Sequence, residues 1–197
     1  MQTWFCFLIL SAVAQAQAPS TGDPAFATVP FDRWIAAGDH AQIPWKVQVA
    51  APVLGFGLRL YVEIKVTVQG KEVARRPQGE LILLVQFTDS QGRVYRDHGT
   101  LDLAELQKSG PKQEFALSVG SLVAPGDYRV AVAIFDTAAN EYSFASKTMQ
   151  IRAPSGDVLP GIWRAVPAVE TLPAEEAPEA WYYPTLKGRL YLGTVNK

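Results

Sequence analysis

The stretch LVAPGDYRVAVAIFD, residues 122–136, carries the strongest structural signal in the chain. Its Pro125-Gly126 pair is a turn sequence, because proline presets one backbone angle and glycine tolerates conformations closed to other residues. After the turn, apolar side chains recur at every second position, namely Tyr128, Val130, Val132 and Ile134. A period of two is typical of a β-strand with one buried face. The stretch therefore predicts a chain reversal followed by a strand over residues 127–136.

Two earlier segments show related patterns. Residues 58–69 alternate strictly, with Leu60, Val62, Ile64, Val66 and Val68 on one face. This pattern predicts a strand with one buried and one wet face. In residues 81–88 both faces are apolar except for Gln86 and Thr88, which predicts a central strand or one covered on both sides. Residues 89–92 are turn formers that reverse the chain.

Shorter patterns complete the set. Residues 45–49, 94–95, 113–119 and 142–152 look strand-like, and residues 100–109 favour a short strand followed by a helical turn. About seven short strands separated by turn signals are expected of a β-sandwich. The sequence therefore predicts an all-β, antiparallel sandwich over residues 42–153.

Leu122 precedes Tyr128 by six residues across the Pro125-Gly126 turn, and this layout resembles the tyrosine corner of immunoglobulin and fibronectin type III domains. The resemblance implies an Ig-like sandwich in which Leu122 fills the end of the core and the Tyr128 hydroxyl bonds to nearby backbone. The longer stretch Leu122–Ile151 is also similar to Ig-like modules of secreted acidobacterial proteins that carry von Willebrand A-related domains. No Asp-x-Ser-x-Ser metal-adhesion signature occurs in the sequence, so the resemblance implies only a structural or adhesive role.

The N-terminus has the layout of an export signal. Residues 1–18 combine an apolar stretch with small residues at Ala14, Ala16 and Ala18, which favours a secretory signal peptide over a buried helix. Residues 19–41 begin without periodicity and predict a linker and N-terminal segment. Signal cleavage would remove Cys6, the single cysteine, leaving a fold without disulfides. We expect a secreted or periplasmic protein of the bacterial envelope.

The C-terminal part changes character. Residues 154–187 hold six of the 14 prolines and predict an extended, proline-rich extension. The segment also carries exposed-looking aromatic residues, which either contact a partner or, as we favour, pin the extension onto the sandwich. These are Trp163, Trp181, Tyr182 and Tyr183. Residues 188–197 resume alternation and predict a terminal strand or the start of a truncated further domain.

The composition limits the classes of partner that we expect for this chain. The net charge is −1, and the basic residues are scattered, so no nucleic-acid partner is expected. The Arg75-Arg76 pair is interpreted as a solvated loop tip. No apolar run approaches the roughly 20 residues of a membrane-spanning helix, so no membrane span is expected after signal cleavage. A protein partner in the envelope, or a further domain of a longer chain, is the partner we expect.

The sequence offers little for catalysis. His40 and His98 each follow an aspartate, Asp39 or Asp97, and a hydrolase would need one of them beside a serine. The candidate serines are Ser90, Ser109 and Ser143. No Gly-x-Ser-x-Gly elbow occurs, and both Asp-His pairs lie in polar segments. We therefore expect no catalytic residues.

Metal binding is also not expected. Two separated histidines without cysteine make a poor zinc site. Calcium is the alternative if four loop aspartates gather at one end of the sandwich, although turn formation explains them better. These aspartates are Asp89, Asp97, Asp127 and Asp136. Glu63, Glu80 and Glu114 lie on strand patterns, where an exposed face explains them without glycoside chemistry.

The sequence thus favours a non-catalytic, exported Ig-like module for protein–protein contact or structural spacing in the cell envelope, without a cofactor. The alternative is a secreted hydrolase or carbohydrate-binding module on the same sandwich. Fold class alone does not separate these two, because sandwiches host many functions.

Overall fold

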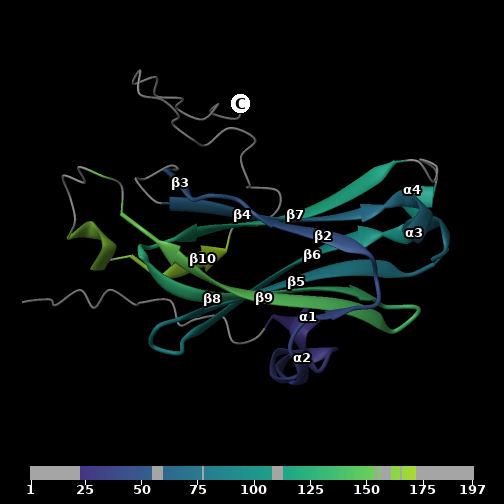
Figure 1. Cartoon of the computed structure of the whole chain (residues 1–197), viewed down its shortest axis with the longest axis horizontal. Coiled ribbons are helices and arrows are strands. Elements are labelled where there is room, and N and C mark those ends of the chain that lie inside the picture. Colours follow the sequence, from purple (N-terminus) through teal and green to yellow (C-terminus); the bar gives the residue numbers. More distant parts are fainter. Residues whose placement is uncertain are drawn as a thin grey trace, which may run out of the picture.

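The computed structural model describes residues 23–54, 60–76, 78–107, 113–153, 155, 161–164 and 166–171. Two antiparallel sheets face each other and enclose the core (Figure 1). The first sheet, sheet A, has the strand order β1-β9-β8-β5-β6, and the second, sheet B, has the order β10-β7-β4-β2, with β3 paired to β4. The predicted all-β sandwich is confirmed.

Sheet A consists of β1 (His40–Ala41), β5 (Glu80–Asp89), β6 (Val94–Asp102), β8 (Gly126–Asp136) and β9 (Glu141–Ile151). Sheet B consists of β2 (Trp45–Val49), β3 (Val53–Leu54), β4 (Leu60–Gln69), β7 (Glu114–Val123) and β10 (Val169–Thr171). The helical elements are α1 (Pro24–Ala27), α2 (Phe31–Ala37), α3 (Gly70–Ala74), α4 (Leu103–Gln107) and the 3₁₀ turn η2 (Ile162–Arg164). None of the described helices is long and apolar enough to span a bilayer.

The main core follows from the alternation along β4 and β5. Val62, Ile64 and Val66 of β4 have no exposed surface. They share one apolar cluster with Leu81, Leu83 and Val85 of β5. Burying such a side chain stabilises the fold by about 1.5–3 kcal/mol, so this inner layer supplies much of the driving force.

Strand β5 is central and covered on both sides, as its sequence predicts. It pairs with β6 on one edge and with β8 on the other. Its inward residues enter the main core, whereas Ile82 and Leu84 face outward and are also buried. An apolar outer face of this kind requires a cover.

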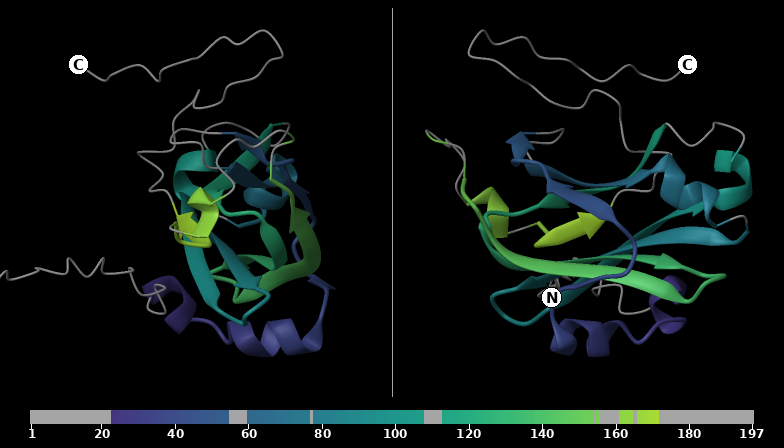
Figure 2. Two further views of the ribbon diagram at one scale, coloured as in Figure 1. Left: turned by 90° about the vertical axis from the view of Figure 1, so that its left-hand side faces the viewer. Right: turned by 45° about the vertical axis from the view of Figure 1, so that its right-hand side comes forward.

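The cover comes from the N-terminal segment, where the structure departs from the predicted linker. Phe26, Phe31 and Trp34 of α1 and α2 are buried against the outer face of sheet A, and both helices lie beneath this sheet in Figure 2. The indole of Trp34 stacks on the ring of Tyr142, with centroids 4.1 Å apart. Residues 23–37 are therefore part of the folded unit, because their aromatic side chains bury apolar strand surface that water would otherwise contact.

The predicted proline-rich extension also contributes to the fold. Strand β10 pairs with β7, placing Val169 opposite Val123, and Trp163 of η2 is half-buried against the main core. The other aromatic residues of this extension, Trp181, Tyr182 and Tyr183, for which we favour pinning over partner contact, lie outside the described residues. Residues 1–18 and 188–197 lie outside them as well.

The turn at Pro125-Gly126 joins β7 of sheet B to β8 of sheet A. The Tyr128 hydroxyl oxygen lies 2.9 Å from the carbonyl oxygen of Ala124 and 3.0 Å from that of Ala168. Leu122, expected to fill the end of the core, is only half-buried, and Val123 is fully buried instead. Successive side chains of β7 point to opposite faces, so Leu122 falls on the outer face of sheet B.

Tyr128→Phe should lower the free energy of unfolding by about 1–2 kcal/mol, because the buried carbonyl oxygen of Ala124 loses the hydroxyl proton that it shares with the carbonyl oxygen of Ala168. Chemical denaturation measures the change. Tyr61→Phe is the matched control, since the Tyr61 hydroxyl lies on the outer face over Gly120, and it should change stability by less than about 0.5 kcal/mol. Equal effects of the two variants would contradict this account of Tyr128.

Trp34→Ala should lower the free energy of unfolding by about 3 kcal/mol, the loss expected for a buried tryptophan. The exposed neighbour Arg33 provides the control Arg33→Ala, for which we expect little change. Thermal and urea unfolding test both variants. If Trp34→Ala unfolds like the wild type, the segment is the linker that the sequence predicts.

Candidate functional site

The structure brings three side chains of metal-ligand type together at the free edge of sheet A. His98 and Asp97 belong to the edge strand β6, and Asp23 precedes α1. His98 Nδ1 and Asp23 Oδ2 are 2.8 Å apart, and Asp97 Oδ1 accepts a 2.8 Å hydrogen bond from the His98 backbone N–H. One ligand atom from each residue lies within 4.8 Å of the other two. We call this group the Asp23–Asp97–His98 cluster.

Local structure explains how Asp23 reaches the cluster. Its Oδ1 accepts a 3.0 Å hydrogen bond from the backbone N–H of Ala25 and so caps α1, which leaves Oδ2 for the imidazole of His98. Pro24 follows directly, at the start of the helix, where its missing N–H is not needed. The cap therefore fixes the direction of the Asp23 carboxylate.

The electrostatics of the cluster centre on Asp97. Burial and, to a smaller extent, the negative charge of Asp23 raise the pKa of Asp97 to about 6. The hydrogen bond from the His98 backbone N–H and the charge of His98 act in the opposite direction. Two carboxylates thus share a partly buried space with one imidazole, an arrangement that favours an added positive charge.

A second contact holds the N-terminal segment to the same strand. Arg96 of β6 donates hydrogen bonds to Asp32 Oδ1, at 2.8 Å, and to Gln86 Oε1, at 2.9 Å. Its guanidinium carbon lies 5.0 Å from the centre of the Phe26 ring, in cation–π range. An open hollow of about 520 Å³ is lined by residues 26–33 and Arg96. Strand β6 therefore anchors the N-terminal segment at two points.

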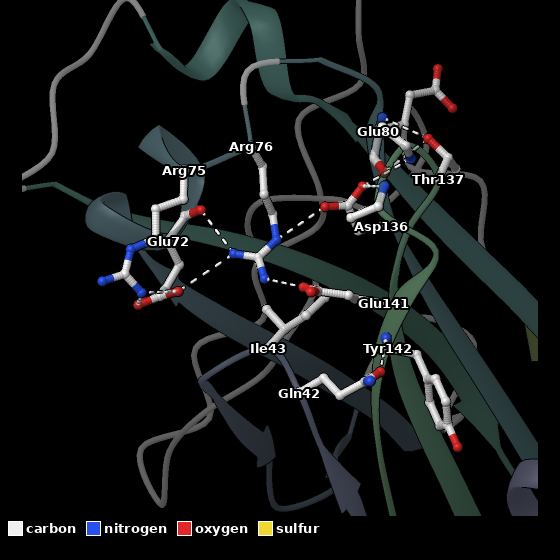
Figure 3. A network of polar contacts seen from close by, with 12 residues as sticks. Gln42, Ile43, Glu72, Arg75, Arg76, Glu80, Asp136, Thr137, Glu141 and Tyr142 are labelled. Atoms are coloured by element: carbon white, nitrogen blue, oxygen red, sulfur yellow. Dashed lines mark hydrogen bonds and ion pairs between the residues drawn. The ribbon is translucent and has the colours of Figure 1, made fainter.

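A buried ion-pair network occupies another part of the sheet (Figure 3). Arg76 lies among three acidic residues: its Nε is 3.0 Å from Asp136 Oδ2, and a terminal nitrogen is 2.6 Å from Glu141 Oε2. Another terminal nitrogen donates to the Glu72 carbonyl at 2.9 Å. The predicted solvated loop tip holds for Arg75, whose side chain is 72% exposed, but is wrong for Arg76, which is 11% exposed. The network ties the segment after α3 to the β8–β9 hairpin and has a structural explanation.

The two histidines do not share a site. His40 lies on β1 and His98 on β6, the opposite edges of sheet A. The His40 ring is 4.5 Å from the Tyr142 ring. Ser143 is fully buried, and its hydroxyl exchanges two 2.8 Å hydrogen bonds with the backbone of Ile43. Ser90 lies in the β5–β6 turn, and Ser109 lies outside the described residues.

The loop aspartates do not gather at one end, as a calcium site would require. Asp89 pairs with Tyr128 at one end of the β5–β8 ladder, and Asp136 pairs with Leu81 at the other. Asp89 Oδ1 accepts from the backbone of Gln91 and Arg93, and Asp136 Oδ1 accepts from that of Ala138 and Ala139. Both therefore form turns, the explanation that the sequence favours.

Sequence reasoning missed Asp23. The Asp23-Pro24 pair is a recognisable helix start, with an N-cap acid before a proline. That signal identifies the short helix but not the histidine, which lies 75 residues further along the chain. The pairing follows only from the docking of α1 beside β6.

Comparison with known proteins assigns no family. No protein-family model matches the chain, and no curated protein is significantly similar to it. Among solved structures, a glycosyl hydrolase family 2 member from Bacteroides cellulosilyticus DSM 14838 aligns at 14% identity and a TM-score of 0.35. The alignment covers 55% of this chain and 14% of that enzyme. An X-ray structure of a Northeast Structural Genomics Consortium target aligns at 13% identity and a TM-score of 0.32, over 59% and 92% of the two chains.

Asp97→Asn should stabilise the protein near pH 7.5 when EDTA is present. The folded-state pKa of Asp97 is about 6, above its ordinary 3.8, so the folded chain binds this proton more tightly than the unfolded chain. The resulting stability is present below the ordinary value and is lost as the pH rises through about 6. Because the carboxylate is partly solvated, we expect a gain of about 1 kcal/mol near pH 7.5.

Urea unfolding in EDTA at a series of pH values measures this difference. The variant and the wild type should converge near pH 4, where the wild-type carboxyl is protonated in the folded state. Asp127→Asn, at an exposed site on β8, is the control and should follow the wild type throughout. A stability gain for Asp97→Asn that is larger near pH 4 than near pH 7.5 would disprove this account.

Proposed function

We propose that the chain is a non-catalytic, exported Ig-like module that serves protein–protein contact or structural spacing in the cell envelope. The order of the strands supports the Ig-like part of this proposal. Lettered in chain order as A, B, C, C′, E, F and G, strands β2, β4 and β7 form an A-B-E sheet. Strands β9, β8, β5 and β6 form the facing G-F-C-C′ sheet. The turn before Tyr128 then falls at the E–F corner, where tyrosine corners occur.

The observation that carries the spacing role is that both flanks are built into the sandwich. The segment before the first long strand covers the outer face of sheet A, and β10 extends sheet B beyond β7. Docked flanks hold the entering and leaving chain in defined positions on the module, which is the property a spacer needs.

The burial and hydrogen bonds of the candidate serine nucleophile favour this role over the hydrolase alternative. The Ser143 hydroxyl is buried and bonded to the backbone of Ile43, and Ser143 on β9 is separated from His98 on β6 by β8 and β5. A serine hydrolase needs a base within hydrogen-bond reach of an accessible hydroxyl. The secreted hydrolase or carbohydrate-binding module is therefore the second candidate, and its distinguishing property is activity on, or binding to, a sugar or ester.

Crosslinking in cells that export the chain tests the proposal. Exposed lysines accept an amine-reactive reagent on several sides of the module: Lys46, Lys65, Lys71 and Lys147. We expect reproducible crosslinks to an envelope protein and no turnover of chromogenic ester or glycoside substrates by the purified chain. The proposal fails if no protein is crosslinked, or if the chain turns over a substrate and either His98→Ala or His40→Ala abolishes that activity.

A further inference from the structure

We propose that the Asp23–Asp97–His98 cluster binds a divalent transition-metal ion of the zinc type, which fastens the N-terminal helices to the edge of sheet A. This site goes beyond the proposed function and does not depend on it. The ligands would be one imidazole nitrogen and two carboxylate oxygens from two separate parts of the chain, Asp23 before α1 and the Asp97-His98 pair on β6.

The geometry of the cluster fits a small cation. All three ligand atoms lie within 4.8 Å of one another, and the Asp23 and His98 atoms are already 2.8 Å apart. Zinc binds imidazole nitrogen and carboxylate oxygen at about 2.0–2.2 Å, so neighbouring ligand atoms around it lie about 3–3.5 Å apart. For all three to bind one ion, the Asp97 carboxylate, whose Oδ1 accepts a 2.8 Å hydrogen bond from the adjacent His98 backbone N–H, must move closer to the other two ligand atoms.

A hydrogen bond between Asp23 and His98 explains why these two side chains meet. It does not explain why the Asp97 carboxylate lies beside them. This third residue adds a second carboxylate to a half-buried space, and its ligand atom lies within 4.8 Å of those of Asp23 and His98. A divalent cation bound between the two carboxylates would offset their mutual repulsion. Metal binding therefore turns an unfavourable arrangement into a favourable one.

The mixed donor set selects the class of ion. Imidazole nitrogen suits zinc and other transition metals, whereas magnesium and calcium prefer all-oxygen sites. Three protein ligands leave a coordination position for water, as in open zinc sites. In a chain whose single cysteine is Cys6, far from the sandwich in sequence, such a bridge would perform the bracing role that disulfides have in many small domains.

Titration of the full chain with zinc chloride tests the site. The protein is stripped with EDTA and dialysed, and calorimetry then gives the stoichiometry and Kd, with magnesium chloride as the comparison ion. We expect one zinc ion per chain and a rise in Tm of about 5–10 °C at a hundredfold excess over Kd. Zinc should also slow tryptic cleavage after the exposed Arg33 of α2 several-fold, since it holds this segment on the sheet.

Matched variants show whether zinc binds at the Asp23–Asp97–His98 cluster or elsewhere on the chain. His98→Ala and Asp97→Asn should each weaken zinc binding at least tenfold and abolish the protection of Arg33, whereas His40→Ala, on the opposite edge of sheet A, should bind like the wild type. If His98→Ala does not fold, Asp97→Asn, which we expect to be stabilised, carries the comparison. The proposal is overturned if zinc does not bind, if His98→Ala and Asp97→Asn bind as tightly as the wild type, or if magnesium binds equally well.

Discussion

Sheet A is apolar on both of its faces, and much of the structure depends on this property. Strands β5 and β8 send Leu83 and Val132 into the main core and Leu84 and Ala133 to the opposite side, where they are equally buried. A two-layer sandwich covers only one face of each sheet. The outer face of sheet A therefore needs a third layer, and the only part of the described chain that supplies it is the segment containing α1 and α2.

This requirement also creates the candidate site. Docking of α1 and α2 under the hydrophobic effect brings their polar residues to the edge strand β6, where Asp23 meets His98 and Asp32 meets Arg96. The cluster of acids and imidazole is thus a consequence of where the aromatic side chains pack. A metal ion at the cluster would act on the same contact, because it would add an electrostatic interaction to the apolar packing of Phe31 and Trp34 against sheet A.

Periodicity in the sequence predicts the two sheets but not the third layer, which α1 and α2 form. The alternation along β4 and the two-sided apolar pattern of β5 are local and strong, so they identify one strand with a wet face and another without. The segment with α1 and α2 shows no long periodic pattern of apolar residues. Its two short helices pack on the sheet through only three aromatic side chains. The Asp23–His98 and Arg76–Asp136 contacts join residues far apart in sequence, and no local pattern encodes such pairs. At the β7–β8 turn the Pro-Gly signal locates the corner, whereas strand alternation decides that Val123 rather than Leu122 enters the core.

The central claim is that the N-terminal helices are a structural layer of the sandwich. Two shortened chains test it most directly, one beginning at Pro19 and one at Gly38, compared by thermal unfolding and by binding of the dye ANS. The chain from Pro19 should melt cooperatively and bind little dye. The chain from Gly38 should bind several-fold more dye and melt at a clearly lower temperature, because the outer face of sheet A is exposed. Identical melting and dye binding by the two chains would contradict the account.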